Sequence, residues 1–437
     1  MNKFTSHAAR LLFSLLGCGL MLMLVACGDL STTTRTTVQL QAGKQTAGTS
    51  TSIPVSNGSG TPQTSHPIPA VTPTTLTQAS CPAAGTARAA QMPPLSQGTE
   101  QTLIYVENEK QGDTVLSGSL YGIGVKTHKT TPLVSFASTA IHDAQVSTDG
   151  QWVLFGSLVP GTPDVLAIEL VRIDGQYLQT LYCGVGASIG QISWSIDQKH
   201  VVFTLMAGTS TMYEFSISQG GDVLPLVWGD ISIMTWLDTT HLYIIDSTLV
   251  HQQNGLLKLD LIDTTKFRQQ LQNIPTIITS ATSDASFDTS LDGTKLYQSQ
   301  NVNSVGTIRV LPAYGGSPTT LYNDTAGAIQ QVRVVSSSAM LVILSSATLG
   351  HTGLYKMNLD GTGLTALFGK NVVLNSSSQY TWSNVSRDGT LYAVKTSELG
   401  STAQTLTVGA LDNTLSPSTY VQNDGTGEIE VVGWTTM

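Results

Sequence analysis

Residues 146–155, VSTDGQWVLF, decide the fold. A short strand runs into a Ser-x-Asp-Gly turn, and a second, strongly apolar strand follows at once. Serine and aspartate side chains bond to backbone amides in such turns, and glycine takes the positive φ that the turn needs. The stretch therefore predicts a β-hairpin.

The same pattern recurs along the chain, at residues 192–203, 233–243, 287–297, 332–342 and 382–392. The copies lie about 41 to 54 residues apart. Each is followed by two more short strands joined by glycine turns, and no amphipathic helix intervenes. A period of this length with four strands per unit is typical of a β-propeller blade.

Counting units predicts seven blades, with six left open. The first unit has strands at 102–106, 119–125 and 131–135 but lacks an inner strand. The chain also has an extra strand at 428–434, which aligns with the innermost strand at 189–194. We expect this C-terminal strand to complete the first blade and close the ring, which removes open sheet edges.

The turn residues recur once per unit, so we expect them to be structural and predict no catalytic residue, metal site or cofactor. His200 and His241 hold equivalent turn positions and are expected to be exposed, and no histidine pair has zinc-binding spacing. The structural turn residues are Asp149, Gly150, Asp197, Asp238, Asp292, Gly293, Asp388 and Gly389.

The N-terminal segment has the composition of an export signal. Lys3 and Arg10 precede an apolar run over 11–26, which ends in small residues directly before Cys27. A spanning helix needs about 20 apolar residues, so this shorter run predicts a signal peptide at residues 1–26. An ordinary secretory signal and an uncleaved anchor helix remain alternatives.

Residues 27–97 are rich in Ser, Thr, Pro and Gly, and their few apolar residues follow no period. Such a segment cannot bury enough surface to offset its ordering entropy, so we expect a disordered linker before a propeller at 98–437. Cys81 and Cys183 could form a disulfide in an oxidising compartment or remain separate thiols.

The net charge is −9 and only 11% of the residues are charged, without a basic cluster. This composition argues against a nucleic-acid partner. It also argues against a polybasic contact with anionic lipid.

Leu24, Val25 and Ala26, placed directly before Cys27, resemble the lipobox of bacterial lipoproteins. The resemblance implies cleavage before Cys27 and a diacylglyceryl group on its sulfur. It places the mature protein in the bacterial cell envelope, held to the membrane on the extracytoplasmic side. Two acyl chains anchor a protein stably, since each buried methylene contributes about 0.8 kcal/mol.

The repeat resembles the TolB-like, WD-repeat-like β-propellers. Residues 146–150 and 386–389 match the family's turn without its proline, and residues 353–355 with 360–363 match its second half. The resemblance covers about residues 98–437 and implies the fold.

For the function we expect a monomeric, non-catalytic binding or scaffold module for a protein, peptide or glycan. The alternatives are a lyase- or dehydrogenase-like enzyme that uses the central channel, and a sensor subunit. We predict that the protein is not an enzyme, because its inner strands carry mainly Ser, Thr, Gln, Trp and Val.

Overall fold

The computed structural model describes residues 80–437 apart from 97, 113, 160–164, 186, 187, 208, 248–256, 283, 304, 346–351, 370, 371, 374–382 and 398–402. The expected signal peptide, the lipobox with Cys27 and the linker up to residue 79 lie outside these residues. Among the described residues, no helix has both the length and the apolarity to cross a bilayer.

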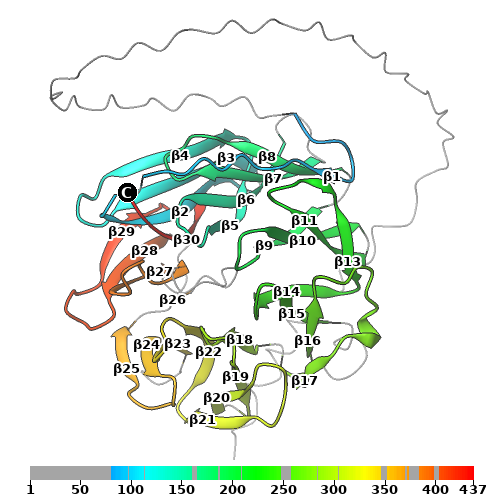
Figure 1. Ribbon diagram of the computed structural model, residues 1–437. Helices are drawn as coiled ribbons and strands as arrows, with labels where there is room; N and C mark the ends of the chain where they lie inside the picture. Colours follow the sequence, from blue (N-terminus) through cyan, green and yellow to red (C-terminus); the bar gives the residue numbers. More distant parts are fainter. Residues whose placement is uncertain are drawn as a thin grey trace, which may run out of the picture. The chain divides into compact units, whose positions relative to one another are not determined.

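Seven four-stranded antiparallel sheets form the propeller within the described residues, which confirms the predicted architecture (Figure 1). We number the blades in chain order and name the strands of each blade A to D, from the axis outward. Their order from A to D is as follows. Blade 1 has β30 (Gly427–Thr436), β2 (Gln101–Gln111), β3 (Thr114–Gly124) and β4 (Thr130–Ala137); blade 2 has β5 (Ile141–Val146), β6 (Trp152–Leu158), β7 (Val165–Arg172) and β8 (Gln179–Val185). Blade 3 has β9 (Ser188–Trp194), β10 (His200–Ala207), β11 (Thr209–Ser216) and β13 (Leu224–Trp228); blade 4 has β14 (Ile231–Trp236), β15 (His241–Asp246), β16 (Leu257–Asp263) and β17 (Thr276–Ala281).

The remaining three blades repeat this plan. Blade 5 has β18 (Ser286–Thr289), β19 (Lys295–Val302), β20 (Val305–Pro312) and β21 (Thr319–Asp324); blade 6 has β22 (Ala328–Val334), β23 (Ala339–Ser345), β24 (Gly353–Asn358) and β25 (Thr365–Phe368). Blade 7 has β26 (Val372–Val373), β27 (Leu391–Ser397), β28 (Gln404–Ala410) and β29 (Ser418–Gln422). Two short strands, β1 (Thr86–Ala87) and β12 (Gly221–Asp222), pair outside the blades, and a 3-10 turn spans Leu271–Asn273.

Ring closure follows the prediction. Strand β30 pairs with β2 over nine residue pairs, from Gln101–Thr436 to Glu109–Gly427, and it supplies the inner strand of blade 1. Trp194, Trp236 and Trp434 lie near the ends of β9, β14 and β30 and are at most 1% exposed. The three tryptophans hold equivalent places, so the C-terminal strand packs as the other inner strands do.

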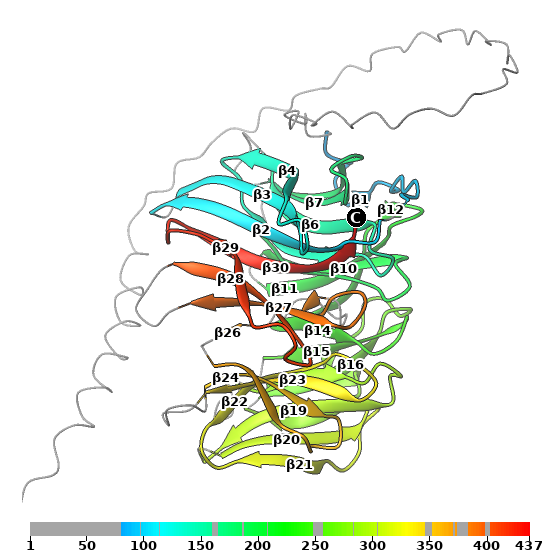
Figure 2. The same cartoon turned by 90° about the vertical axis from the view of Figure 1, so that its left-hand side faces the viewer.

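The apolar core lies between the blades. Alternate side chains of each strand face the neighbouring sheet, and one cluster joins Trp152 and Leu181 of blade 2 to Trp194 and Phe203 of blade 3. Figure 2 shows the blades edge-on, with the strands crossing the thickness of the ring. Because the strands alternate in direction, the C–D turns of all seven blades and the A–B turns of blades 2 to 7 lie at the same end of the ring. We call this end the turn face.

The linker ends earlier than the sequence indicated. Residues 80–96, here called the strap, pack against blades 2 and 3. Strand β1 pairs with β12, and the Arg88 and Ala90 amides donate to the carbonyls of Leu181 and Ile217 at 2.7 Å each. Ala87 is 7% exposed in the core cluster. The prediction of a disordered linker is wrong for residues 80–96. Backbone hydrogen bonds, rather than apolar side chains, hold the strap against blades 2 and 3.

Cys81 of the strap forms a disulfide with Cys183 of β8, with a Cα–Cα distance of 5.6 Å. The bond closes a loop of 102 residues.

We expect the double variant Cys81→Ala, Cys183→Ala to lose about 3 kcal/mol of unfolding free energy, because the unfolded chain regains the freedom of this loop. Urea titration with and without reductant measures the change. Reductant should shift the wild-type midpoint and leave that of the variant in place, and equal midpoints for both proteins would contradict the prediction.

Candidate functional site

The predicted turn aspartates lie in the A–B turns of their blades. Asp149, Asp197, Asp292 and Asp388 each accept a hydrogen bond from the serine two residues earlier, at 2.5 to 2.8 Å. Each also accepts from the backbone amide two residues later, at 3.0 to 3.2 Å. Gly150, Gly293 and Gly389 follow with φ values of +66° to +73°, which glycine adopts without strain.

Asp238 of blade 4 has further contacts. Its carboxylate accepts from the Thr240 and His241 amides at 2.8 Å each, and also from the Tyr314 hydroxyl of blade 5 at 2.9 Å. His241 Nδ1 lies 2.9 Å from the same Oδ2 atom. Burial opposes ionisation, but the bonds from Thr240, Tyr314 and His241 outweigh it and lower the pKa of Asp238. His241 is therefore engaged between two blades and is not the exposed repeat feature we expected.

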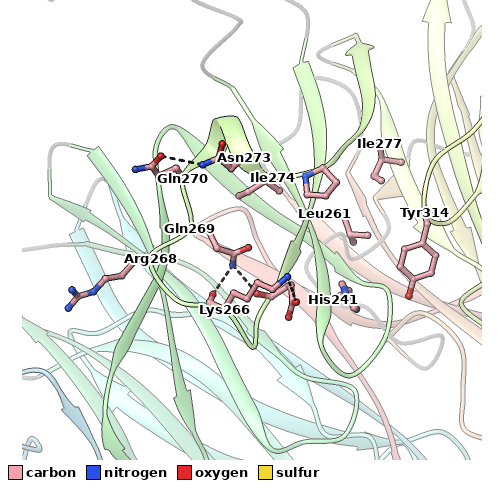
Figure 3. Close-up of a pocket in the computed structure, with 12 residues that line it drawn as sticks. His241, Leu261, Lys266, Arg268, Gln269, Gln270, Asn273, Ile274, Ile277 and Tyr314 are labelled. Atoms are coloured by element: carbon pink, nitrogen blue, oxygen red, sulfur yellow. Dashed lines mark hydrogen bonds and ion pairs between the residues drawn. The ribbon is translucent and has the colours of Figure 1, made fainter.

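A hollow of about 840 Å³ opens on the turn face beside this cluster. We call it the blade 4–5 hollow (Figure 3). Its apolar lining consists of Leu261, Ile274, Pro275 and Ile277 together with the ring of Tyr314. The rest of the lining is polar or charged and consists of His241, Asp263, Lys266, Arg268, Gln269, Gln270 and Asn273. A concave apolar surface with a few polar groups is the usual form of a ligand site.

The long C–D connection of blade 4, residues 264–275, builds the polar wall. Its Arg268 and Gln269 amides donate to Pro225 and Leu226 of blade 3, at 2.9 and 2.7 Å. The Gln269 side chain donates to the Asp263 and Lys266 carbonyls at 2.8 Å each. The connection is thus tied to blade 3 and to strand β16 of its own sheet, and these bonds hold the polar wall in place.

Within the polar wall, the positive charge of Lys266 is balanced by a neighbouring carboxylate. Lys266 Nζ lies 3.0 Å from Asp263 Oδ2. Burial raises the pKa of Asp263, but hydrogen bonds from Thr265 and Lys266 outweigh it, and the net effect is a lowered pKa. Arg268 stands at the rim with its side chain directed outward (Figure 3). Lys266 and Arg268 exceed Asp263 by one charge, and the Asp238 carboxylate bonded to Tyr314 offsets this excess.

The turns of blades 4 and 5 carry exposed apolar side chains. Tyr314 is 62% exposed, Phe267 46% and Leu291 59%, and all three stand on turns of blades 4 and 5. A second hollow of about 650 Å³ lies next to them, between blades 5 and 6, lined by Leu291, Asp292, Lys295 and Asp360 among others.

Sequence reasoning missed this site. One signal was present: the interval from Asp238 to Asp292, at 54 residues, is the longest between successive turn aspartates of blades 2 to 5. The extra length includes the connection that forms the wall. Nothing in the sequence pointed to Tyr314, because its contact with Asp238 joins a turn of blade 5 to a turn of blade 4.

The inner strands are also more charged than we expected. Asp143 of β5 and Glu430 of β30 stand on neighbouring inner strands, and Asp143 lies at a bulge with φ +51°. Burial and the charge of Glu430 raise the pKa of Asp143 to about 7. Burial also raises the pKa of Glu430. Farther round the ring, Asp288 of β18 pairs with Arg333 of β22 at 3.6 Å, both nearly inaccessible.

The raised pKa of Asp143 predicts a pH-dependent stability. Its ionisation costs the folded state, so the cost is absent below the unfolded pKa near 4 and complete above pH 7. Asparagine also tolerates positive φ. We expect Asp143→Asn to raise the unfolding free energy at pH 8 by about 2 kcal/mol, with a gain that vanishes near pH 4. Urea titrations across this range test it, with the exposed Asp222→Asn as control. A gain independent of pH would contradict it.

Comparison with protein-family models and with curated proteins gives no match. Solved structures do match. The propeller domain of the Trilobed protease from Pyrococcus furiosus is 10% identical, with a TM-score of 0.51 over 78% of this chain and 97% of that one. Oligogalacturonate lyase in complex with manganese is 10% identical, with a TM-score of 0.50 over 71% of this chain and 92% of that one.

TolB from Acinetobacter baumannii is 12% identical, with a TM-score of 0.41 over 78% of this chain and 66% of that one. Identities this low show the β-propeller fold alone. The matches with TM-scores of 0.50 and 0.51 support the propeller fold, and no property of these proteins transfers to this chain.

Our prediction that the protein is not an enzyme is wrong. Structures with the same fold include a lyase and the propeller of a protease, so the fold does not exclude catalysis. The reason we gave, that the inner strands carry mainly uncharged residues, is also wrong. Charged residues do occur on the inner strands, namely Asp143, Glu430, Asp288 and Arg333. The enzyme status of this propeller is undetermined.

Proposed function

We propose that this protein is a lipid-anchored extracytoplasmic protein that binds a protein, peptide or glycan ligand on its turn face. One observation carries the binding proposal: the blade 4–5 hollow combines apolar side chains, among them Ile274 and Ile277, with the exposed ring of Tyr314. The anchor proposal rests on the sequence, on Leu24, Val25 and Ala26 before Cys27. The disulfide fits the same proposal, since disulfides persist in oxidising compartments outside the cytoplasm.

Membrane partition tests the anchor. The full-length precursor is expressed in a bacterial host, and the processed protein should enter the detergent-rich phase of a Triton X-114 extraction. A Cys27→Ser variant, which offers no sulfur for acylation, should remain as unprocessed precursor. Equal processing and partition of the two proteins would exclude lipidation at Cys27.

Peptide and glycan arrays probed with the detergent-solubilised protein test ligand binding. We expect Tyr314→Ala to lose most of the signal on the features that the wild type binds, because one wall of the hollow disappears. The matched control is Tyr177→Ala, which removes an exposed tyrosine from the C–D turn of blade 2. Binding that survives Tyr314→Ala, or that falls equally in both variants, would place the ligand elsewhere.

A further inference from the structure

The C–D turn of a blade packs on the outer strand of the blade before it in two pairs of neighbours. Gly175, in the turn of blade 2, lies so close to blade 1 that a Cβ would come within 2.8 Å of the Leu133 carbonyl oxygen. Gly361, in the turn of blade 6, lies against the Leu321 carbonyl of blade 5 in the same way. In these pairs one blade closes directly on the next.

Blade 3 meets blade 2 through the strap instead. A Cβ on Gly220, in the C–D turn of blade 3, would lie 2.6 Å from the Ala87 carbonyl oxygen of the strap. On its other side the strap bonds to the outer strand of blade 2, where the Leu181 carbonyl accepts from the Arg88 amide at 2.7 Å. The strap is therefore an inserted segment that separates the turn of blade 3 from the outer strand of blade 2.

The strap has little buried surface to hold it there. Among its 17 residues only Ala87 is buried, and its other apolar side chains, such as Met92 and Leu95, are covered only in part. Fixing the backbone of one residue costs at least as much free energy as one hydrogen bond contributes. Bonds such as the pair between Gln91 and Gln179, at 2.6 and 2.7 Å, therefore offset only part of the cost of ordering the strap. The covalent bond at Cys81 supplies the rest.

The two sulfurs of this bond differ in their surroundings. Cys81 is exposed, whereas Cys183 is 6% exposed. The Arg88 guanidinium donates to the Ser80 carbonyl, directly before Cys81, at 2.8 Å. A cation beside a cysteine favours its thiolate form, and exposed disulfides exchange with thiols more readily than buried ones. A thiol from outside the protein therefore has access to the bond at Cys81.

We propose that the Cys81–Cys183 disulfide is a site of thiol–disulfide exchange, and that its reduction by a dithiol releases the strap from blades 2 and 3. A thiolate of the dithiol attacks Cys81 Sγ and forms a mixed disulfide, and Cys183 leaves as a thiolate that takes up a proton. The second thiol of the reductant then attacks the reductant's own sulfur in the mixed disulfide, which frees Cys81 as a thiol. The dithiol is oxidised to a disulfide, and the protein gains two thiols.

Release of the strap lengthens the attachment of the propeller. In the oxidised protein the chain is fixed to blade 2 at Cys81. In the reduced protein the first fixed residue is Glu100, whose amide donates to the Met437 carbonyl at 3.1 Å. The 17 residues of the strap then add at most about 60 Å of extended chain. The longer attachment rests on the lipid anchor proposed above, whereas the release itself depends neither on the anchor nor on a ligand in the blade 4–5 hollow.

Hydrogen exchange tests the release. The full-length processed protein in detergent is compared before and after treatment with dithiothreitol, and alkylation followed by mass spectrometry confirms the reduction. We expect the amides of residues 85–91 to exchange about tenfold faster after reduction, and those of β9 and β10 to keep their rates. The double variant Cys81→Ala, Cys183→Ala is the matched control and should exchange fast at residues 85–91 with or without dithiothreitol.

Three results would overturn the proposal. The first is a disulfide that dithiothreitol does not reduce in the folded protein. The second is a strap that stays as protected after reduction as before. The third is equal acceleration in the strap and in β9 and β10, which would show that the bond only supports the fold.

A trapping experiment identifies the sulfur that is attacked. A dithiol oxidoreductase whose second active-site cysteine is replaced by serine stops at the mixed disulfide. Mass spectrometry should find this enzyme bonded to Cys81, and a mixed disulfide on Cys183 would overturn attack at the exposed sulfur. If the strap is released in a protein whose Cys27 carries no lipid, the proposed anchor fails and the exchange site stands.

Discussion

Deletion of residues 427–437 is expected to abolish cooperative folding of the propeller. The deletion removes all of β30 and leaves blade 1 with three strands. It exposes the inner edge of β2 along nine residue pairs and removes the fully buried Trp434 from its cluster. An open edge of this length also favours aggregation. Urea titration followed by tryptophan fluorescence should show no sigmoidal transition.

A synthetic peptide of residues 425–437 provides the complementary experiment. Added in trans to the truncated protein during refolding, it should restore the transition by donating the missing strand. A peptide of the same composition in scrambled order is the control. Cooperative unfolding of the truncated protein by itself would show that blade 1 does not need β30.

Arg387→Met is expected to lower the unfolding free energy by about 3 kcal/mol, because it leaves buried carbonyls without a donor. The guanidinium of Arg387, in the A–B turn of blade 7, donates to the Trp434 carbonyl at 2.9 Å and to the Thr148 and Ser147 carbonyls at 2.7 and 2.9 Å. Burial lowers its pKa to about 10, against the opposing charge of Asp149.

The position of Arg387 explains the size of this effect. In blade 1 no turn connects strands A and B, because β30 and β2 come from opposite ends of the propeller sequence. Arg387 spans that gap from blade 7 to blade 2. Arg387→Lys should recover only part of the loss, since one ammonium cannot reproduce the fork of donors. The exposed Arg268→Met serves as control, and equal stabilities of both methionine variants would contradict the role of Arg387.

The fold could be predicted because it depends on local signals. Each Ser-x-Asp-Gly turn predicts a hairpin, and the spacing between the turns indicates a four-stranded blade. The extra strand at 428–434 indicated the closure because it ends in a tryptophan, Trp434, as the inner strand at 189–194 ends in Trp194.

The site could not be predicted because it depends on contacts between blades. Asp238 appears as one turn aspartate among several, and only the structure brings the Tyr314 hydroxyl of the next blade to it. The strap was missed for a related reason. Its backbone amides make the bonds, and Ala87, Arg88 and Ala90 carry no periodic pattern that would indicate a strand.

The disulfide also determines how the propeller withstands tension. A force applied to the chain at residue 80 passes through Cys81 into β8 of blade 2 within one residue. The strap, strands β2 to β4 of blade 1 and strands β5 to β7 of blade 2 lie inside the covalent loop of 102 residues and are shielded from the force, whereas β30 lies outside the loop. In single-molecule pulling between residue 80 and the C-terminus, the oxidised protein should therefore release a shorter contour length than the reduced protein.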